Sequence, residues 1–384
     1  MRKTVIGIIA GVVAGVVIGT TLVGPRLVLN PTPAPNAKQP PAAPAKEPVT
    51  AALPLAGTQL AGLAATRWRL AAAYNRSLPQ VGELADRVET VLWRISGGGF
   101  ELKAYPPGKL APTDRILDAV AAGTVDAAFI TPEALAARNT ALQLFAGAPF
   151  GPSARARLAW TYFGGGRELA NRMFNKLGVQ ALPCGALAPE AGGWFRAQVR
   201  TVEDLGGLRI RMGGLGARVM EKLGAIPKNL KAEDIFVALE NGELDAVSFS
   251  MPAVDAQLKL NDMARFYYFP GWQRPATLFH LVINLDRWRA LSAVRKAQLE
   301  TVCGDAVRDA LASSEAVQFA ALKDLTAKGV VISRWPTEVM AALKAAWREV
   351  VSEENAQNPD FREVWEALTA FERDFDIWRE LATY

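Results

Sequence analysis

The segment from Leu208 to Pro252 alternates between strand-like and helix-like patterns, and no other feature of the chain constrains the fold as strongly. Leu208–Arg211 alternates apolar and basic residues as a short strand does, and a glycine-rich stretch follows it. Further elements then alternate: a helix over 217–223, a strand over 226–230, a helix over 234–241 and a strand over 244–249. Strands separated by helices pair in parallel, so the segment predicts an α/β layer structure.

Arg211 stands at the end of the first of these strands, just before the glycines. In open α/β sheets, ligands bind at the carboxyl ends of the strands, where a helix N-terminus adds positive potential. The planar, always-charged guanidinium of arginine suits two-point contact with a carboxylate. The pattern therefore predicts that the chain holds an anion against Arg211. The structural alternative is an arginine that pairs with an acidic side chain at the surface.

Two stretches of the chain match one another. Ala119-Val-Ala-Ala-Gly-Thr-Val-Asp-Ala127 aligns with Ala238-Leu-Glu-Asn-Gly-Glu-Leu-Asp-Ala246, and both read as a helix end, a glycine stop and the start of a strand. The patterns before the first copy also alternate: strands over 68–74, 100–105 and 125–130, and helices over 81–95 and 115–122. A short match can be a common local solution. Together with this alternation, it predicts two similar α/β lobes.

The N-terminus predicts where the protein is located. Met1-Arg2-Lys3 precedes an uncharged run, Thr4–Gly24, that is long enough to span a bilayer as a helix. Basic residues in front keep that end in the cytoplasm, so the rest of the chain is expected outside. A cleaved signal peptide is the alternative, but the run is long and no small-x-small cleavage site follows closely. We therefore expect residues 1–24 to anchor the chain in the inner membrane, with residues 25–65, rich in Pro and Ala, as an extended tether.

Composition excludes several classes of function. The net charge of +5 comes without a Lys/Arg cluster, so nucleic acid is not an expected partner. With one histidine and two cysteines there is no Cys/His metal cluster, and no nucleophile-elbow or phosphate-loop motif is present. We therefore expect no enzyme activity. The two cysteines, Cys184 and Cys303, can form a disulfide in an oxidising compartment, but the sequence leaves open whether they lie close together.

Over residues 67–286 the chain resembles the DctP-type substrate-binding subunits of TRAP (tripartite ATP-independent periplasmic) transporters. The resemblance lies in the order and spacing of six segments: ISGGGFELKAYPPGKL, ILDAVAAGTVDAAFITP, WTYFGGG, GGWF, DLGGLRIRMGGLGARVMEKLGA and FYYFPGW. The GGWF and FYYFPGW segments look most like the sub-branch that binds 2-oxo acids and related small carboxylates.

The resemblance implies a two-lobed periplasmic-binding-protein fold with a ligand cleft between the lobes. Lobe I is expected over 66–188 with part of 280–330, and lobe II over 189–279. Residues 286–384 form amphipathic helices that brace both lobes. Some related proteins dimerise through such helices, so a homodimer is a further expectation, and packing within one chain is the alternative. The implied function is capture of a small organic acid and its delivery to the membrane subunits of a TRAP transporter. A module that reports its ligand to a membrane receptor is the alternative.

The resemblance also implies a binding site, from which this chain departs at several positions. Arg211 matches the arginine that contacts the substrate carboxylate. Glu190 stands where the 2-oxo-acid sub-branch has a glutamine, and Ser248-Phe249 stands where that sub-branch has a Glu-Trp pair. Glu133-Ala134 replaces two tyrosines that some relatives carry.

Some relatives hold a metal ion beside the ligand, at the positions of Glu190 and Ser248. Glu190 could therefore bind a sodium or calcium ion, accept a donor on a different substrate, or offset Arg211, and the sequence leaves these choices open. Trp194, Phe249 and Trp272 are candidates for an apolar wall of the cleft, although such aromatic residues are more often part of a core.

Overall fold

The computed structural model describes residues 65–382 of the 384-residue chain. The predicted membrane anchor and all but the last residue of the predicted tether lie outside this range. Among the residues described, no helix is long and apolar enough to cross a membrane.

Sheet A contains five strands in the order β2-β1-β3-β10-β4. Their bounds are β1 (Thr66–Ala72), β2 (Phe100–Tyr105), β3 (Ala127–Ile130), β4 (Val179–Leu187) and β10 (Thr277–Asn284). Strand β1 pairs in parallel with β2 and β3, whereas β10 runs antiparallel to β3 and β4. Every residue of β4 and β10 is buried, which explains why both sequences are almost continuously apolar.

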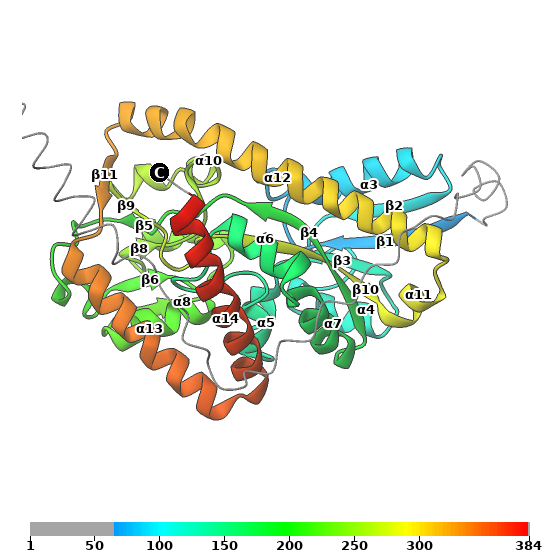
Figure 1. The fold of residues 1–384 in the computed structure, drawn as a ribbon. Coiled ribbons are helices and arrows are strands. Elements are labelled where there is room, and N and C mark those ends of the chain that lie inside the picture. Colours follow the sequence, from blue (N-terminus) through cyan, green and yellow to red (C-terminus); the bar gives the residue numbers. More distant parts are fainter. Residues whose placement is uncertain (1–64, 383–384) are drawn as a thin grey trace, which may run out of the picture. The chain divides into compact units, whose positions relative to one another are not determined.

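Sheet B contains six strands in the order β11-β9-β5-β8-β6-β7. Their bounds are β5 (Gly193–Phe195), β6 (Arg209–Arg211), β7 (Ile226–Lys228), β8 (Ala246–Val247), β9 (Phe266–Phe269) and β11 (Val331–Arg334). Strand β6 pairs in parallel with both β7 and β8, as the alternating segment predicted. The two-sheet α/β class is confirmed, and Figure 1 shows both sheets with their helices.

The helices connect and cover these strands. Their bounds are α3 (Leu84–Ile95), α4 (Ile116–Ala121), α5 (Thr140–Gln143), α6 (Ala154–Phe163), α7 (Gly166–Lys176), α8 (Gly214–Lys222), α9 (Ala232–Glu240), α10 (Pro252–Asp255), α11 (Leu285–Ala290), α12 (Ala293–Ala327), α13 (Thr337–Gln357) and α14 (Pro359–Ala382). The predicted helices agree with α3, α4, α8 and α9 to within a few residues at each end.

The two matching stretches of sequence also have the same local structure. In each copy a helix, α4 or α9, ends at a glycine with positive φ, 73° at Gly123 and 69° at Gly242. The aspartate that follows accepts a hydrogen bond from the backbone N–H of an arginine in the neighbouring strand. Asp126 bonds Arg69 at 2.6 Å, and Asp245 bonds Arg209 at 3.0 Å. The same strand–helix–strand unit therefore occurs once in each sheet.

The C-terminal helices pack against elements of both sheets. In Figure 1, α12 runs along both of them. Its first half packs Leu299 and Val302 into the core of sheet A, and its last turns place Leu325 in a core cluster of sheet B. Helix α13 packs against α8, and α14 packs against α5, α6 and α7. One feature differs from the predicted all-helical pattern: β11 interrupts the helices and adds a parallel edge strand beside β9.

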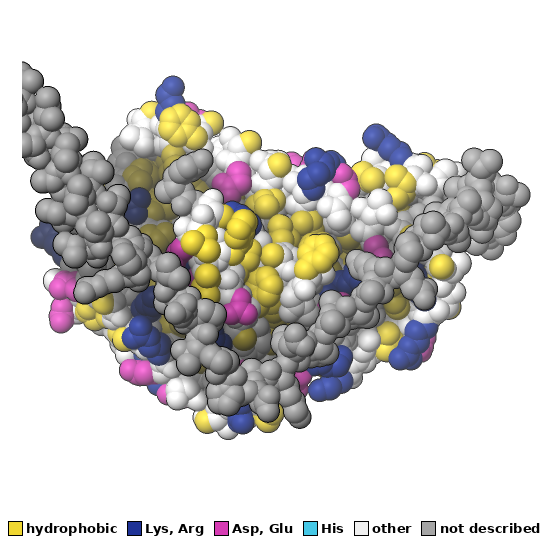
Figure 2. Space-filling view, viewed as in Figure 1, with side chains coloured by type: hydrophobic (Ala, Val, Ile, Leu, Met, Phe, Trp, Pro, Cys, Tyr) yellow, Lys and Arg dark blue, Asp and Glu magenta, His cyan; other side chains and the backbone are white. Residues whose placement is uncertain are grey.

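The end of α14 exposes large apolar side chains, Ile377, Trp378 and Leu381, each more than half accessible to solvent. Figure 2 shows apolar side chains on the face of the molecule where α6 and α14 lie. The homodimer expected from the sequence stays a prediction.

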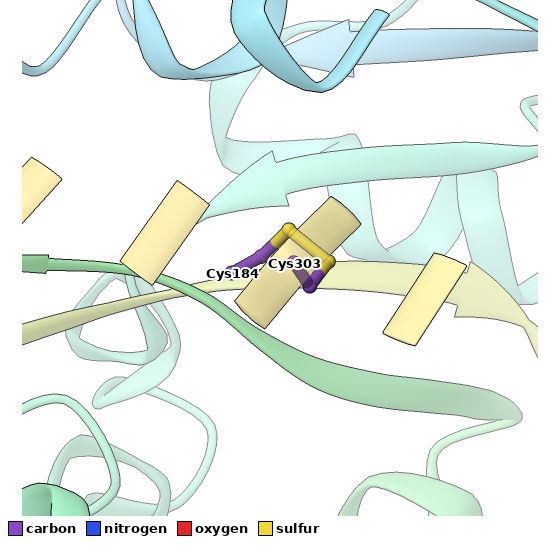
Figure 3. Close-up of a disulfide and its surroundings, with 2 residues drawn as sticks. All are labelled: Cys184 and Cys303. Atoms are coloured by element: carbon purple, nitrogen blue, oxygen red, sulfur yellow. A yellow bond between two sulfur atoms is a disulfide. The ribbon is translucent and has the colours of Figure 1, made fainter. Parts of the chain in front are cut away.

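A disulfide joins β4 to α12. Cys184 and Cys303 are both buried, and their sulfur atoms are 2.06 Å apart (Figure 3). The bond ties β4, an edge strand of sheet A, to a cysteine of α12 that lies 119 residues further along the chain. It settles the question that the sequence left open, and it suits a protein of an oxidising compartment.

We expect the C184A/C303A double variant to lose about 2–5 kcal/mol of unfolding free energy, because the bond closes a long loop in the unfolded chain. Urea denaturation of the oxidised protein measures this loss. Dithiothreitol should destabilise the wild type by a similar amount and leave the double variant unchanged. Equal stability of the oxidised wild type and the variant would contradict the prediction.

Candidate functional site

Five ionisable side chains from both sheets lie together. The pKa of Arg211 is set first by burial and then by the charges of four neighbours, Arg274, Glu133, Glu190 and Tyr74. We call these five residues the charged cluster. Tyr74 and Glu133 follow β1 and β3 of sheet A, and Arg211 ends β6 of sheet B. These are the carboxyl ends of parallel strands, where α/β proteins bind ligands.

Backbone carbonyl groups hold Arg211 in place. Its Nε donates to the oxygen of Leu230 at 3.1 Å, and its Nη1 donates to the oxygen of Ser248 at 2.9 Å. The guanidinium also lies over the ring of Phe249, 5.1 Å from its centroid. These contacts orient the side chain at the end of β6 without neutralising its charge.

Arg211 has no acidic partner. Within the described part of the chain, no carboxylate lies within ion-pair distance of its guanidinium. Burial, and then the positive charge of Arg274, lower its pKa. A partly buried guanidinium in this state is stabilised by an added anion. The alternative of an arginine paired at the surface is therefore not what the structure shows.

Arg274 differs from Arg211 because it is fully paired. Its Nη1 donates to Oε1 of Glu190 at 3.1 Å, and its Nη2 is paired with Oε1 of Glu133. The two carboxylates raise its pKa, against the opposing effect of burial. The loop that carries Arg274 packs directly on the backbone at Glu190, where a Cβ on Gly271 would overlap the Glu190 carbonyl oxygen. This glycine therefore permits the pairing.

Glu190 is almost completely buried, with 4% of its surface exposed. Its Oε1 accepts hydrogen bonds from Arg274 and from the hydroxyl of Thr277 at 3.1 Å. Its Oε2 is buried, and none of the described residues bonds to it. Burial raises the pKa of Glu190, and Arg274 opposes that rise.

Ser248 and Gln273 form a neutral polar pair beside the charged cluster. The amide nitrogen of Gln273 donates to the hydroxyl of Ser248 at 3.1 Å and to the carbonyl of Ala191 at 2.6 Å. The amide oxygen of Gln273 is buried, and it too lacks a partner among residues 65–382. Two buried acceptor oxygens, on Glu190 and Gln273, are therefore without donors.

Of the predicted ligand-binding residues, the structure brings Arg211, Glu190, Ser248 and Phe249 close together. The two tryptophans are placed differently. Trp272 is buried and stacks on Phe150 at 5.6 Å, and its indole N–H has no partner in the described part of the chain. Trp194 packs in a core cluster of sheet B, stacked on Tyr267 at 3.9 Å. Its contacts are those of a core residue.

Arg274 and Gln273 are site residues that the sequence analysis missed. They follow the predicted FYYFPGW segment directly, between β9 and the buried strand β10. The sequence offers one signal for them, namely two polar residues, a glutamine and an arginine, between two apolar runs. That signal does not say which way a loop turns its side chains.

A groove lined by Pro189, Phe269, Pro270, Leu322, Ile332, Ser333 and Arg334 also reaches Glu190. Arg211 is not part of its lining. The groove lies between β9, β11 and α12, and its charged lining residues are Glu190 and Arg334.

The carboxylates of the cluster do not form a metal site. Among residues 65–382, no group of three or more His, Cys, Asp or Glu side chains could hold a metal ion. Arg274 already pairs with Oε1 of Glu133 and with Oε1 of Glu190. A second positive charge about 4 Å from a guanidinium would be repelled by about 4 kcal/mol at an effective dielectric constant of 20. Arg274 therefore disfavours a calcium or sodium ion between these two carboxylates.

Comparison with known proteins gives a consistent result. The model of the bacterial extracellular solute-binding proteins, family 7 (DctP), matches residues 72–358. The monocarboxylate 2-oxoacid-binding periplasmic protein of Nostoc sp. is 31% identical over 322 residues, which cover 84% of this chain and 88% of that protein.

Two crystal structures are also similar. A TRAP transporter solute binding protein from Bordetella bronchiseptica, with copurified calcium and picolinate, has a TM-score of 0.81 and 33% identity, covering 83% of this chain and 95% of its own. A TRAP periplasmic solute binding protein from Pseudoalteromonas atlantica, with bound sodium and pyruvate, has a TM-score of 0.79 and 28% identity, covering 83% and 97%.

Asp255 predicts how stability depends on pH. It is fully buried, and it accepts hydrogen bonds from Trp194 at 3.0 Å and Tyr267 at 2.8 Å. Burial raises its pKa from 3.8 to about 7, against the effect of these donors. Because the folded protein holds this proton more tightly, its contribution to stability is full below pH 3.8 and is lost as pH rises to about 7.

We therefore expect the free energy of unfolding of the wild type to contain a falling component between about pH 4 and 7, on the order of 4 kcal/mol. Urea denaturation at several pH values measures it. Asp255→Asn cannot titrate, so the difference between variant and wild type should change with pH over this range. A constant difference would contradict the raised pKa.

Proposed function

The chain belongs to the bacterial extracellular solute-binding proteins of family 7, and on this premise we propose that it captures a small organic acid in the periplasm and delivers it to the membrane subunits of a TRAP transporter. The observation that carries the proposal is Arg211, a guanidinium without an acidic partner at the end of β6. An incoming carboxylate would accept two parallel hydrogen bonds from such a group.

Lobe I is proposed as 66–188 with part of 280–330, and lobe II as 189–279. Contacts between them support a closing cleft: Glu133, which follows β3 of sheet A, pairs with Arg274, which follows β9 of sheet B. The side-chain oxygen of Gln143 in α5 also accepts the backbone N–H of Leu215 in α8 at 2.9 Å. Opening the cleft would break these bonds, and a ligand held by both lobes would favour the closed state.

A monocarboxylate is the ligand class that the relatives favour. The protein from Nostoc is named for monocarboxylate 2-oxoacids, and the structure from Pseudoalteromonas atlantica holds pyruvate. The proposed ligand-binding residues are Arg211, Glu190, Ser248 and Phe249. Trp272 directly precedes Gln273 in the chain. A sensing module would use the same site, and nothing in the fold favours it.

The proposed setting is the periplasm. Family members act outside the cytoplasm, and the buried disulfide is compatible with an oxidising compartment. Anchoring through residues 1–24 and association into a homodimer stay predictions.

Arg211→Ala should weaken binding of a small carboxylate by about 10²–10³, because the ligand loses its buried charge partner. A thermal-shift screen of pyruvate, other 2-oxo acids and small hydroxy acids would identify the ligand, and titration calorimetry would give the affinities. In the wild type, a ligand at a hundred times its dissociation constant should add about 2.7 kcal/mol of stability.

Arg209→Ala provides a matched control. Arg209 lies on the same strand, but its guanidinium is paired with Asp245 at 2.6 Å, and it is not part of the charged cluster. Its loss should leave affinity for the carboxylate within about twofold. A ligand that binds the Arg211→Ala variant as tightly as the wild type would remove Arg211 from the site.

A further inference from the structure

We propose that Arg274 supplies the positive charge beside the ligand, so that this chain binds its carboxylate without a metal ion. The same geometry assigns the ligand a hydrogen-bond donor next to its carboxylate, as in a 2-hydroxy acid. The inference rests on the proposed function and specifies the ligand of that site.

The first support is the position of the Arg274 guanidinium. It bridges Glu133 and Glu190, whose carboxylates are the only acidic groups of the charged cluster. Both glutamates are largely shielded from solvent, with 16% and 4% of their side chains exposed. Arg274 pairs with Oε1 of each glutamate, so a covalently attached cation lies where a metal ion that bridges the two carboxylates would lie.

The second support is the balance of charge. Arg211 and Arg274 carry two positive charges, and Glu133 and Glu190 carry two negative ones, so the cluster is neutral before a ligand binds. One carboxylate at Arg211 then adds a single negative charge beside an unpaired guanidinium. With this carboxylate the cluster carries a net charge of −1, and a calcium ion would change that charge to +1.

The third support is the pair of acceptor oxygens without donors. Oε2 of Glu190 and Oε1 of Gln273 are both buried, and none of the described residues donates to them. Gln273 also links to Ser248, whose carbonyl holds Arg211. Because buried acceptors are costly when unpaired, the ligand that fits best offers a donor there. A 2-hydroxy acid has such a donor, whereas the oxygen of a 2-oxo acid only accepts.

The test compares lactate with pyruvate, binding to the full-length chain by titration calorimetry. Each ligand is measured in a sodium-free buffer with EDTA, and again with added calcium or sodium. We expect lactate to bind at least tenfold more tightly than pyruvate, with affinity unchanged within about twofold by EDTA, calcium or sodium. Binding that requires calcium or sodium would overturn the metal-free site. Tighter binding of pyruvate would overturn the assigned ligand class.

Two variants keep the test decisive. Arg274→Gln leaves Glu133 and Glu190 without a cation, so calcium should raise its melting temperature and its affinity for lactate, while the wild type does not respond. Glu190→Gln keeps the size of the side chain but presents an amide donor, so it should shift the lactate-to-pyruvate preference toward pyruvate by about tenfold. If Arg274→Gln does not fold, Glu190→Gln and the wild-type measurements still test the ligand class and the metal-free binding. An unchanged preference in Glu190→Gln would overturn the role of Glu190.

Failure of the proposed function gives a different result. If the wild type binds no small carboxylate with or without metal, the proposed function and this inference are both overturned. If carboxylates bind and Arg211→Ala abolishes binding, but only in the presence of a metal ion, the proposed function is supported and this inference alone fails.

Discussion

The paired guanidinium of Arg274 is the interaction on which the site depends. It joins Glu133, at the end of a strand in sheet A, to Glu190, which enters sheet B, and it comes from the loop between β9 and β10. Burying three charges is costly, and a pair of this kind is stable only when each member keeps its partners. The cluster therefore acts as a unit: Arg274 fixes Glu190 and pairs with both acids, and Arg211 is left as the guanidinium that a ligand carboxylate can pair with.

The fold could be predicted in large part because its signals are local. The repeated glycine stop and Asp-Ala strand start mark the same unit in both sheets, and the aspartate in each copy bonds an arginine on the adjacent strand. Strand β11 was missed because its four residues lie among long helices, and only pairing with β9 makes them a strand. Likewise, the bond between Cys184 and Cys303 depends on how α12 lies on β4, which spacing along the chain does not reveal.

The site was predictable only where a strand end places a side chain. Arg211 ends β6 and Ser248 directly follows β8, so their closeness results from the parallel pairing of these strands. Arg274 lies on a loop whose path depends on contacts far along the chain, including Gly271 against Glu190. For Trp194, the sequence predicted a binding role that the contacts do not support. This large aromatic residue is held in the core by Asp255 and Tyr267.

A cation that is part of the chain has a different consequence from one that is bound. A bound ion links ligand affinity to ion concentration, because each stabilises the site for the other. Arg274 is part of the chain and always charged, so ligand affinity does not depend on the concentration of an ion. Because Arg274 pairs with Glu133, its charge lies at the contact between the two sheets. Closing the cleft then also pairs the charge of Arg274 with that of Glu133. Opening the cleft would separate Arg274 from Glu133 and leave Glu190 as its remaining acidic partner. This ion pair therefore disfavours the open state, and the ligand's own contacts supply the rest of the free energy that holds the lobes together.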